Sequence, residues 1–396
     1  MRASATLRRE RATLRRALLA LGAAHLRLSL EHSRSVLVLG MLVALASSSV
    51  LGLVVRSSPL RQPSRGGLTA TATATAAEQP LTSLLDLADQ YDAFLLDQFG
   101  VIHDGKTAYD GAVEAVSELQ RRKKKIIIIS NSSRRKSDTF ARLRAMGFES
   151  DLSPDDPPIS VVTSGDLVWE GLAAAAAPPF ADLGLKCTVF GNGEDDEEYV
   201  CSCGKVAVPV AEADFLLARG LFSILGTGPD LLRQPFSPYS AQSEEALLRE
   251  AMARRSGGLP LLVANPDTTR PDGKDSPMPG LLAARYRAMG ATDIRMVGKP
   301  HELIYDACRK ELAAAGLPAA ARVAAVGDSL HHDVLGAAAN GIDSVFICGG
   351  VHYRELGVPQ AAAVPPTPAK LAALIGGFAA EHEGTVPTYA LAGFRL

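Results

Sequence analysis

The sequence predicts an α/β fold: a Rossmann-like core built on a parallel sheet, with a second α/β domain inserted into it. Beyond residue 80, short runs rich in β-branched residues alternate with segments of helical periodicity, as in parallel α/β proteins. The run KIIII at 125–129 is continuously apolar, as expected of a strand covered on both faces. About 170 residues separate the polar residues that follow this run from Lys299, too many for one crossover connection, so an inserted domain is expected.

Residues 1–78 differ in composition from the rest of the chain. Glu10 and Glu31 are the only acids before Glu78, and arginines recur among alanines and leucines at helical spacing near the start. This composition is typical of an organellar presequence, so we expect a plastid or mitochondrial location. Residues 36–55 carry no charge and are long enough to cross a bilayer, which makes a retained membrane anchor the alternative.

The first part of the core is expected at residues 79–160. Within it, residues 93–97 and 125–129 are predicted to be strands, because they are short, mostly apolar and rich in strand-forming residues. Residues 111–122 and 137–146 show helical periodicity instead.

The inserted domain is expected at 161–279, and its acidic run EDDEE at 194–198 is interpreted as a solvated loop. The second part of the core is expected at 280–360, followed by a C-terminal tail at 361–396. The core strands predicted in this second part are residues 295–300, 322–329 and 343–348.

Polar residues follow the predicted core strands, and in a parallel sheet such strand ends converge at one edge. They are Asp97, Ser130 with Asn131, Lys299 and Asp328. Two carboxylates, a hydroxyl and a lysine around one crevice suit phosphoryl transfer through an aspartyl-phosphate, with Mg²⁺ as cofactor. Mg²⁺ prefers oxygen ligands, which this set supplies.

Five motifs occur in order along the chain: DQFGVIHDG, IISNSS, NPD, GKP and GDSLHHDVLGA. In this order they resemble the haloacid dehalogenase superfamily, and most closely its large-cap subclass IIA, which is phosphatase-like. The resemblance spans about residues 82–355. It implies that Asp97 is the nucleophile, Ser130 the phosphate-binding hydroxyl, Lys299 the phosphate-neutralising lysine, Asp328 a Mg²⁺ ligand and Asp333 a second carboxylate of the metal site.

The resemblance also implies substrate and metal contacts outside this set. Asn131, together with Asn265 and Asp267 of the NPD motif, is expected to contact a small phosphorylated metabolite. Phe99 is expected to bind Mg²⁺ through its backbone carbonyl and to pack near the leaving group with its ring. The net charge of −2 provides no field that would gather nucleic acid, and membrane contact is expected only through residues 36–55. Members of the subclass often dimerise through their caps, so a homodimer is a further expectation.

Phe99 departs from the family pattern DxDG, whose second aspartate acts as acid and base. Such catalysis contributes about 10²- to 10⁴-fold to rates, so three interpretations stay open. The chain is a phosphatase in which His103 or Asp104 takes that role, or which acts only on good leaving groups. It is a metal-free dehalogenase in which Asp97 attacks carbon. Or it is a binding or regulatory module that has lost catalysis.

Overall fold

The computed structural model describes residues 83–396, except 150–152, 154–155, 194, 226–233, 236–240 and 269–276. The predicted presequence and the apolar run at 36–55 therefore lie outside the described residues. Among the residues that are described, no helix combines the length and apolar character needed to cross a membrane. All of them belong to one compact unit, Ala72–Leu396.

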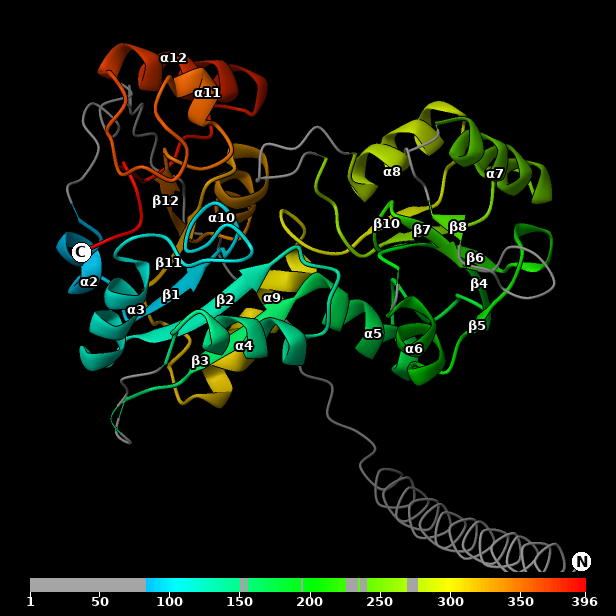
Figure 1. Cartoon of the computed structure of the whole chain (residues 1–396), viewed down its shortest axis with the longest axis horizontal. Coiled ribbons are helices and arrows are strands. Elements are labelled where there is room, and N and C mark those ends of the chain that lie inside the picture. The colour runs from blue at the N-terminus through cyan, green and yellow to red at the C-terminus, as the bar shows by residue number, and fades with distance from the viewer. Residues whose placement is uncertain are drawn as a thin grey trace, which may run out of the picture. The chain divides into compact units, whose positions relative to one another are not determined.

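Six parallel strands form the first sheet, which is the core sheet of the fold (Figure 1). In spatial order they are β13 (Tyr389–Leu391), β12 (Asp343–Ile347), β11 (Val323–Gly327), β1 (Ala93–Leu96), β2 (Lys125–Ser130) and β3 (Ile159–Thr163). Strand β1 is central, since it pairs with both β11 and β2. Asp97 and Asp328 directly follow β1 and β11, so both lie at the carboxyl edge of the sheet.

Both faces of the core sheet are buried. Ile126 and Ile128 belong to the apolar cluster on one face, and Ile127 and Ile129 to the cluster on the other. This alternation explains why the run is apolar at every position. Helices α2 (Leu85–Ala88), α3 (Ala112–Arg121) and α4 (Lys136–Ala145) contribute to the first cluster, and α9 (Glu302–Ala314) and α10 (Leu335–Ala339) to the second.

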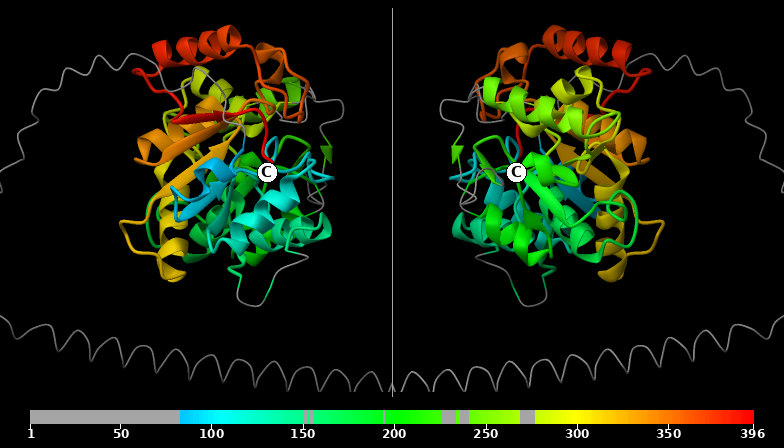
Figure 2. Two further views of the ribbon diagram at one scale, coloured as in Figure 1. Left: turned by 90° about the vertical axis from the view of Figure 1, so that its left-hand side faces the viewer. Right: turned by 90° about the vertical axis from the view of Figure 1, so that its right-hand side faces the viewer.

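The C-terminal residues complete the core sheet, so the prediction of a tail at 361–396 is wrong. Helix α12 (Pro368–Glu381) lies beside α11 (Tyr353–Leu356), and β13 pairs with β12 (Figures 1 and 2). Leu371 and Phe378 of α12 pack in one buried cluster with Phe346 and Ala390 of these strands. Strand β13 has three residues, too few for a periodic signal in the sequence.

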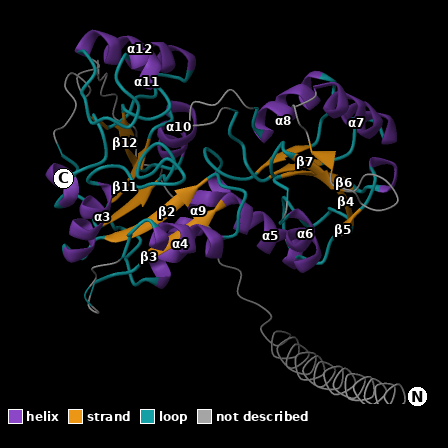
Figure 3. Ribbon diagram, in the orientation of Figure 1, coloured by secondary structure: helices purple, strands orange, loops and turns teal. Residues whose placement is uncertain are grey.

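A second sheet has seven strands, of mixed direction, and carries its own helices. Figure 3 shows it between α7 (Ala241–Arg254) with α8 (Pro279–Ala288) on one side and α5 (Ser164–Ala174) with α6 (Asp196–Ser202) on the other, in agreement with two buried clusters. Its main path in spatial order is β10 (Ile294–Met296), β9 (Leu261–Val263), β6 (Phe215–Ala218), β4 (Lys186–Gly191), β7 (Ser223–Leu225) and β8 (Gln234–Pro235), while β5 (Val206–Ala207) pairs with β4. It is the α/β cap inserted into the core.

The predicted boundaries of this cap at 161–279 need correction. Strand β3 continues to Thr163 in the core sheet, while α8 and β10 belong to the second sheet and its cluster. The inserted part therefore runs from about Ser164 to Met296, and the strand predicted at 295–300 is not a core strand. A three-residue strand is too short for its sequence to show which of two sheets it joins, so the sequence could not place it.

Replacing Leu371 with Ala tests whether α12 is part of the core. Leu371 is fully buried, and truncating a buried leucine costs about 2 to 5 kcal/mol. We expect the free energy of unfolding, measured by urea denaturation, to fall by that amount. Leu374→Ala is the matched control, because Leu374 is only partly buried in the same helix. An unfolding free energy unchanged by Leu371→Ala would contradict this packing.

Candidate active site

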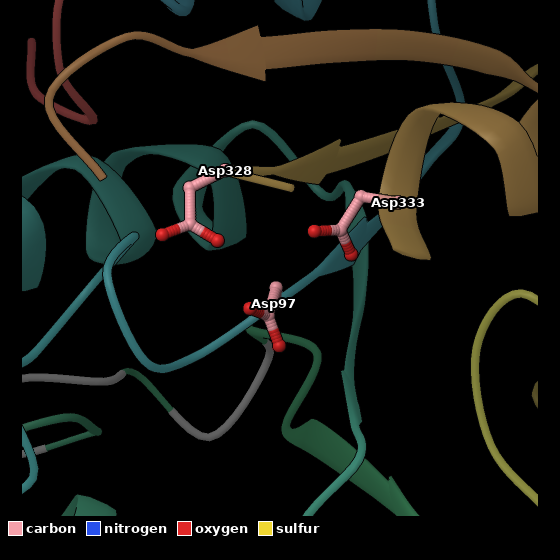
Figure 4. Close-up of side chains that lie close together, drawn as sticks. All are labelled: Asp97, Asp328 and Asp333. Carbon is pink, nitrogen blue, oxygen red and sulfur yellow. The ribbon is translucent and has the colours of Figure 1, made fainter. Parts of the chain in front are cut away.

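Three carboxylates meet at the carboxyl edge of the core sheet. Asp97 follows β1, Asp328 follows β11, and Asp333 lies in the helical turn Leu330–Val334. Figure 4 shows their carboxylates pointing toward one another, and one oxygen of each lies within 4.8 Å of the others. All three are almost fully buried. The structure thus brings together three residues that are 236 positions apart at the extremes of the sequence.

Lys299 is the buried cation of this cluster. Its Nζ lies 2.8 Å from Oδ1 of Asp97 and donates a hydrogen bond of 2.6 Å to Oδ1 of Asp333. Burial alone would lower the pKa of Lys299, but the carboxylates of Asp333 and Asp97 raise it above its ordinary value. The lysine is therefore charged at every physiological pH.

One lysine does not balance three carboxylates. Burial raises the pKa of Asp97 to about 7, against the opposing effect of Lys299. Burial, followed by the charges of Asp97 and Asp333, raises the pKa of Asp328 well above its usual range. Converging carboxylate oxygens that are costly to ionise together are a donor set that fits a divalent cation such as Mg²⁺. Asp97, Asp328 and Asp333 would hold it, and the predicted carbonyl ligand of Phe99 stays a prediction.

Backbone groups fix the direction of two of these carboxylates. The N–H of Val351 donates to Oδ2 of Asp328 at 2.7 Å, and the N–H of Ser329 donates to Oδ2 of Asp333 at 3.0 Å. Gly100 faces Asp328 with a φ of +80°, and a Cβ there would lie 2.0 Å from Oδ2 of Asp328. The glycine of the motif DQFG is therefore required for both its conformation and its lack of a side chain.

Ser130 is positioned to donate a hydrogen bond into the site. Its Oγ accepts hydrogen bonds from Nε2 of Gln98 and from the N–H of Ser132, the latter at 3.1 Å. Both acceptor positions of the hydroxyl are thus used, which leaves its own proton for another partner.

Asn131 joins the returning segments of the cap to the core. Its Oδ1 accepts from the N–H of Lys299 at 2.6 Å, and its Nδ2 donates to Oδ1 of Asp267 at 2.8 Å and to the carbonyl of Lys299 at 3.1 Å. Both amide hydrogens of Asn131 are therefore engaged with protein. Asn265 accepts from the N–H of Asp267 at 3.0 Å, so the NPD motif forms a closed turn.

His103 does not have the environment of a general acid. It is buried, its Nδ1 accepts from the N–H of Gly105 at 3.0 Å, and its Nε2 lies 3.2 Å from Oε1 of Gln98. Burial, with a contribution from Arg142, lowers the pKa of His103 to about 4. The imidazole is therefore neutral near pH 7, with both nitrogens engaged.

Asp104 does not have the environment of a general acid either. Its Oδ1 accepts from the N–H groups of Thr107 and Lys106, each at 2.7 Å, and these hydrogen bonds lower the pKa of Asp104. This carboxylate therefore stays ionised where an acid would need a proton. The ring of Phe99 packs edge-to-face on His103, with 4.7 Å between ring centroids.

A single cavity of about 750 Å³ connects these groups. Every residue that the sequence predicts for the site lines it: Asp97, Phe99, Ser130, Asn131, Asn265, Asp267, Lys299, Asp328 and Asp333. Asn192 and Phe222 of the cap line it as well, so the cap encloses the site. His332 also lines it, with Nδ1 3.4 Å from Oδ1 of Asp267.

The prediction that the acidic run at 194–198 is a solvated loop is wrong for Asp196, whereas Glu197 and Glu198 are exposed, although they lie in helix α6 and not in a loop. Asp196 begins α6, is fully buried, and accepts from Nη1 of Arg219 at 2.6 Å. Arg219 also donates from Nη2 to the carbonyl of Ser133 at 3.2 Å, and Asn192 donates to Oγ of Ser133 at 2.7 Å. These residues attach the cap to the segment that follows Ser130. A charge run alone does not reveal that its partner lies about 23 residues downstream.

Two sequence families and several solved structures are similar to this chain. Residues 94–204 match a family described as haloacid dehalogenase-like hydrolase, and residues 296–371 match one described as HAD-hydrolase-like. A D-glycerol 3-phosphate phosphatase of Mycobacterium tuberculosis is 29% identical over 270 residues, which are 67% of this chain. The match spans 65% of that relative, just under two thirds of its length.

Two solved structures share the fold. A haloacid dehalogenase-like hydrolase from Brucella suis has a TM-score of 0.58 at 24% identity, covering 79% of this chain and 99% of its own. A protein from Cytophaga hutchinsonii described as a possible sugar phosphatase has a TM-score of 0.59 at 18% identity, covering 80% and 99%. Both likenesses extend over core and cap.

The raised pKa of Asp97 predicts that Mg²⁺ stabilises the protein more strongly as pH rises. Without a cation, the folded state keeps a proton that the unfolded chain releases near pH 3.8. The resulting stability is complete below about pH 4 and is lost as the pH rises through about 7. Because Mg²⁺ must displace this proton, and that of Asp328 where Asp328 is protonated too, its apparent Kd should fall at least about tenfold for each unit by which the pH rises below about pH 7.

We expect the rise in melting temperature on adding Mg²⁺ to be larger at about pH 8 than at about pH 6. Asp328→Asn should abolish it, whereas Asp182→Asn, at an exposed ion pair of the cap, should preserve it. An equal rise at both pH values would contradict the assignment of the cation to these carboxylates.

Proposed function

Since the chain belongs to the haloacid dehalogenase-like hydrolases, we propose that it is a Mg²⁺-dependent phosphatase of a small phosphomonoester. The observation that carries this proposal is the buried set of Asp97, Asp328 and Asp333 around Lys299. The similarity to a D-glycerol 3-phosphate phosphatase supports a phosphomonoester as substrate.

In the proposed reaction, a carboxylate oxygen of Asp97 attacks phosphorus, the bond to the leaving alkoxide breaks, and water later hydrolyses the aspartyl-phosphate. Lys299 favours the ionised form of Asp97 against the effect of burial, and it neutralises charge on the phosphoryl oxygens. The Ser130 hydroxyl donates a hydrogen bond to one of those oxygens. Mg²⁺, when bound, would supply the remaining positive charge.

Phe99 sets the range of leaving groups in this proposal. It occupies the position of the family's acid, and neither His103 nor Asp104 fits that role, for the reasons of pKa and hydrogen bonding given above. The enzyme should therefore favour phosphates whose leaving group departs with little protonation.

The two alternatives differ in what the carboxylate cluster does. A metal-free dehalogenase has no use for three converging carboxylates that hinder each other's ionisation, so the cluster weighs against that reading. A binding module is compatible with the same cavity, and turnover distinguishes it from the phosphatase.

Phosphate release from a panel of phosphomonoesters, including p-nitrophenyl phosphate, tests the reaction. We expect turnover with Mg²⁺ and none with EDTA. Asp97→Asn should lower kcat by about 10⁴-fold or more, because the nucleophile is lost. Asp138→Asn, an exposed aspartate of α4, is the matched control and should retain wild-type activity. Release of halide from 2-haloacids without Mg²⁺ would instead establish the dehalogenase.

The role of Phe99 is tested by a series of aryl and alkyl phosphates of increasing leaving-group pKa. In the wild type, kcat/KM should fall steeply along the series. Phe99→Asp should flatten the dependence and raise the rate for poor leaving groups by about 10²-fold or more, because it supplies an acid. Phe99→Ala removes the ring without adding an acid and should leave the slope unchanged. A shallow slope in the wild type would show that another group already donates the proton.

A further inference from the structure

Three cations that the sequence analysis did not single out line the active-site cavity: Lys106, Arg134 and Arg142. Lys106 and Arg134 are exposed, and Arg142 is half-buried. Among the described residues, none of the three forms an ion pair with a carboxylate. Lys299 already serves the carboxylate cluster, so these cations are in excess of what the proposed phosphoryl site uses.

Unlike Arg134, the two cationic residues that follow it in sequence are paired with carboxylates. Arg135 pairs with Asp166, and Lys136 pairs with Asp166 and Glu170 at 3.2 Å. Arg134 stands next to them in sequence and lines the cavity, yet it pairs with no carboxylate among the described residues. Its charge helps to lower the pKa of Asp195, but that carboxylate is bound to Arg219 at 2.9 Å.

The three cations form one group. Arg142 donates a hydrogen bond from Nη2 to the carbonyl of Gly105, and Asp104 accepts from the backbone of Lys106, so the loop that carries Lys106 is held against α4. Burial, followed by repulsion from Arg134, lowers the pKa of Arg142. Asp104 also lines the cavity, but its carboxylate is bound by the backbone N–H groups of Lys106 and Thr107, so it balances the three cations only in part. A bound anion would lower the remaining repulsion between them.

The cavity has room for such an anion in addition to the transferred phosphate. Its volume of about 750 Å³ is in the range of pockets that hold ligands much larger than a phosphoryl group. Phe99 and Phe222 supply apolar wall between polar groups. The lining thus combines the carboxylates and Lys299 around Asp97, two aromatic side chains and three further cations.

We infer that the substrate carries a second anionic group, a phosphate or a carboxylate, that Arg134 and Lys106 bind while the first phosphate lies at Asp97. Arg142 is a positioning residue, since it holds the loop of Lys106 and adds positive charge. The inference rests on the proposed function, because it takes the transferred phosphate to occupy the carboxylate and Lys299 site.

Three ligand series of matched chain length test this inference: alkyl monophosphates, alkanediol bisphosphates and phosphooxy carboxylic acids. We expect kcat/KM of the wild type to favour one of the two series with a second anionic group over the alkyl monophosphates by about tenfold to hundredfold, the effect of one charge-assisted hydrogen bond. Preference for bisphosphates or for carboxylic acids identifies the second group.

Arg134→Gln should bring the ratio of these kcat/KM values close to one, and Lys106→Gln should reduce the ratio. Arg134 is exposed and makes no side-chain hydrogen bond with the described residues, so its replacement should not disturb folding. Arg144→Gln is the matched control, since Arg144 stacks on Phe140 and pairs with Glu149 away from the cavity. It should keep the full preference.

The same ligands are titrated by calorimetry into Asp97→Asn with Mg²⁺, which reports binding without turnover. Turnover without a preference for substrates that carry a second anionic group, or a preference that survives Arg134→Gln, would overturn the subsite. Neither result would contradict the proposed phosphatase activity. If Arg134→Gln lowered kcat/KM equally for all three series, and if high salt abolished this effect, the cations would act by general electrostatic attraction. That result would also overturn the subsite. Absence of turnover would overturn the phosphatase, and equal Kd values for all series would then overturn the subsite as well.

Discussion

The contact of Lys299 with two buried carboxylates is the interaction on which the site depends. A carboxylate or an ammonium buried without a partner costs several kcal/mol, so Asp97, Asp333 and Lys299 are tolerable at the end of the core sheet only together. Asp97 comes from the first part of the core, whereas Lys299 and Asp333 follow the cap. The site is therefore complete only when the inserted domain has returned the chain to the sheet edge.

The return of the chain is fixed by side chains with few other roles. Asn131 binds the backbone of Lys299 and the carboxylate of Asp267, so one residue next to Ser130 holds both segments that leave the cap. Gly298, with a φ of +127°, allows this approach, since a Cβ there would lie 2.5 Å from Oδ1 of Asn131. On the other side, Arg219 and Asn192 bind Ser133. Cap residues are thereby hydrogen-bonded to Asn131 and Ser133, both of which follow Ser130 within three residues.

The sequence was sufficient to predict four core strands, β1, β2, β11 and β12, and the convergence of the polar residues that follow them, because strand ends and motif order are local features that topology brings together. It was insufficient where a short element must choose a partner. Residues 294–296 and 389–391 are each only three residues long, yet one segment joins the second sheet and the other the first. It also could not show that Asp196 pairs with Arg219, since the pairing depends on the cap's tertiary structure. The organellar location and the homodimer stay predictions from the sequence.

The loop from Gln98 to Gly105 is built around the ring of Phe99. The ring packs on His103, and a Cβ at Gly105 would lie 2.7 Å from Cε1 of Phe99. Gln98 ties the same loop to Ser130 and His103. An aromatic ring at this position therefore supports the loop that presents Lys106 to the cavity, while the carboxylates lie at the loop's start. Phe99 thus stands where the family pattern has an acid and packs in the loop that leads to Lys106, so this one residue bears on both proposals, the range of leaving groups and the binding of a second anionic group.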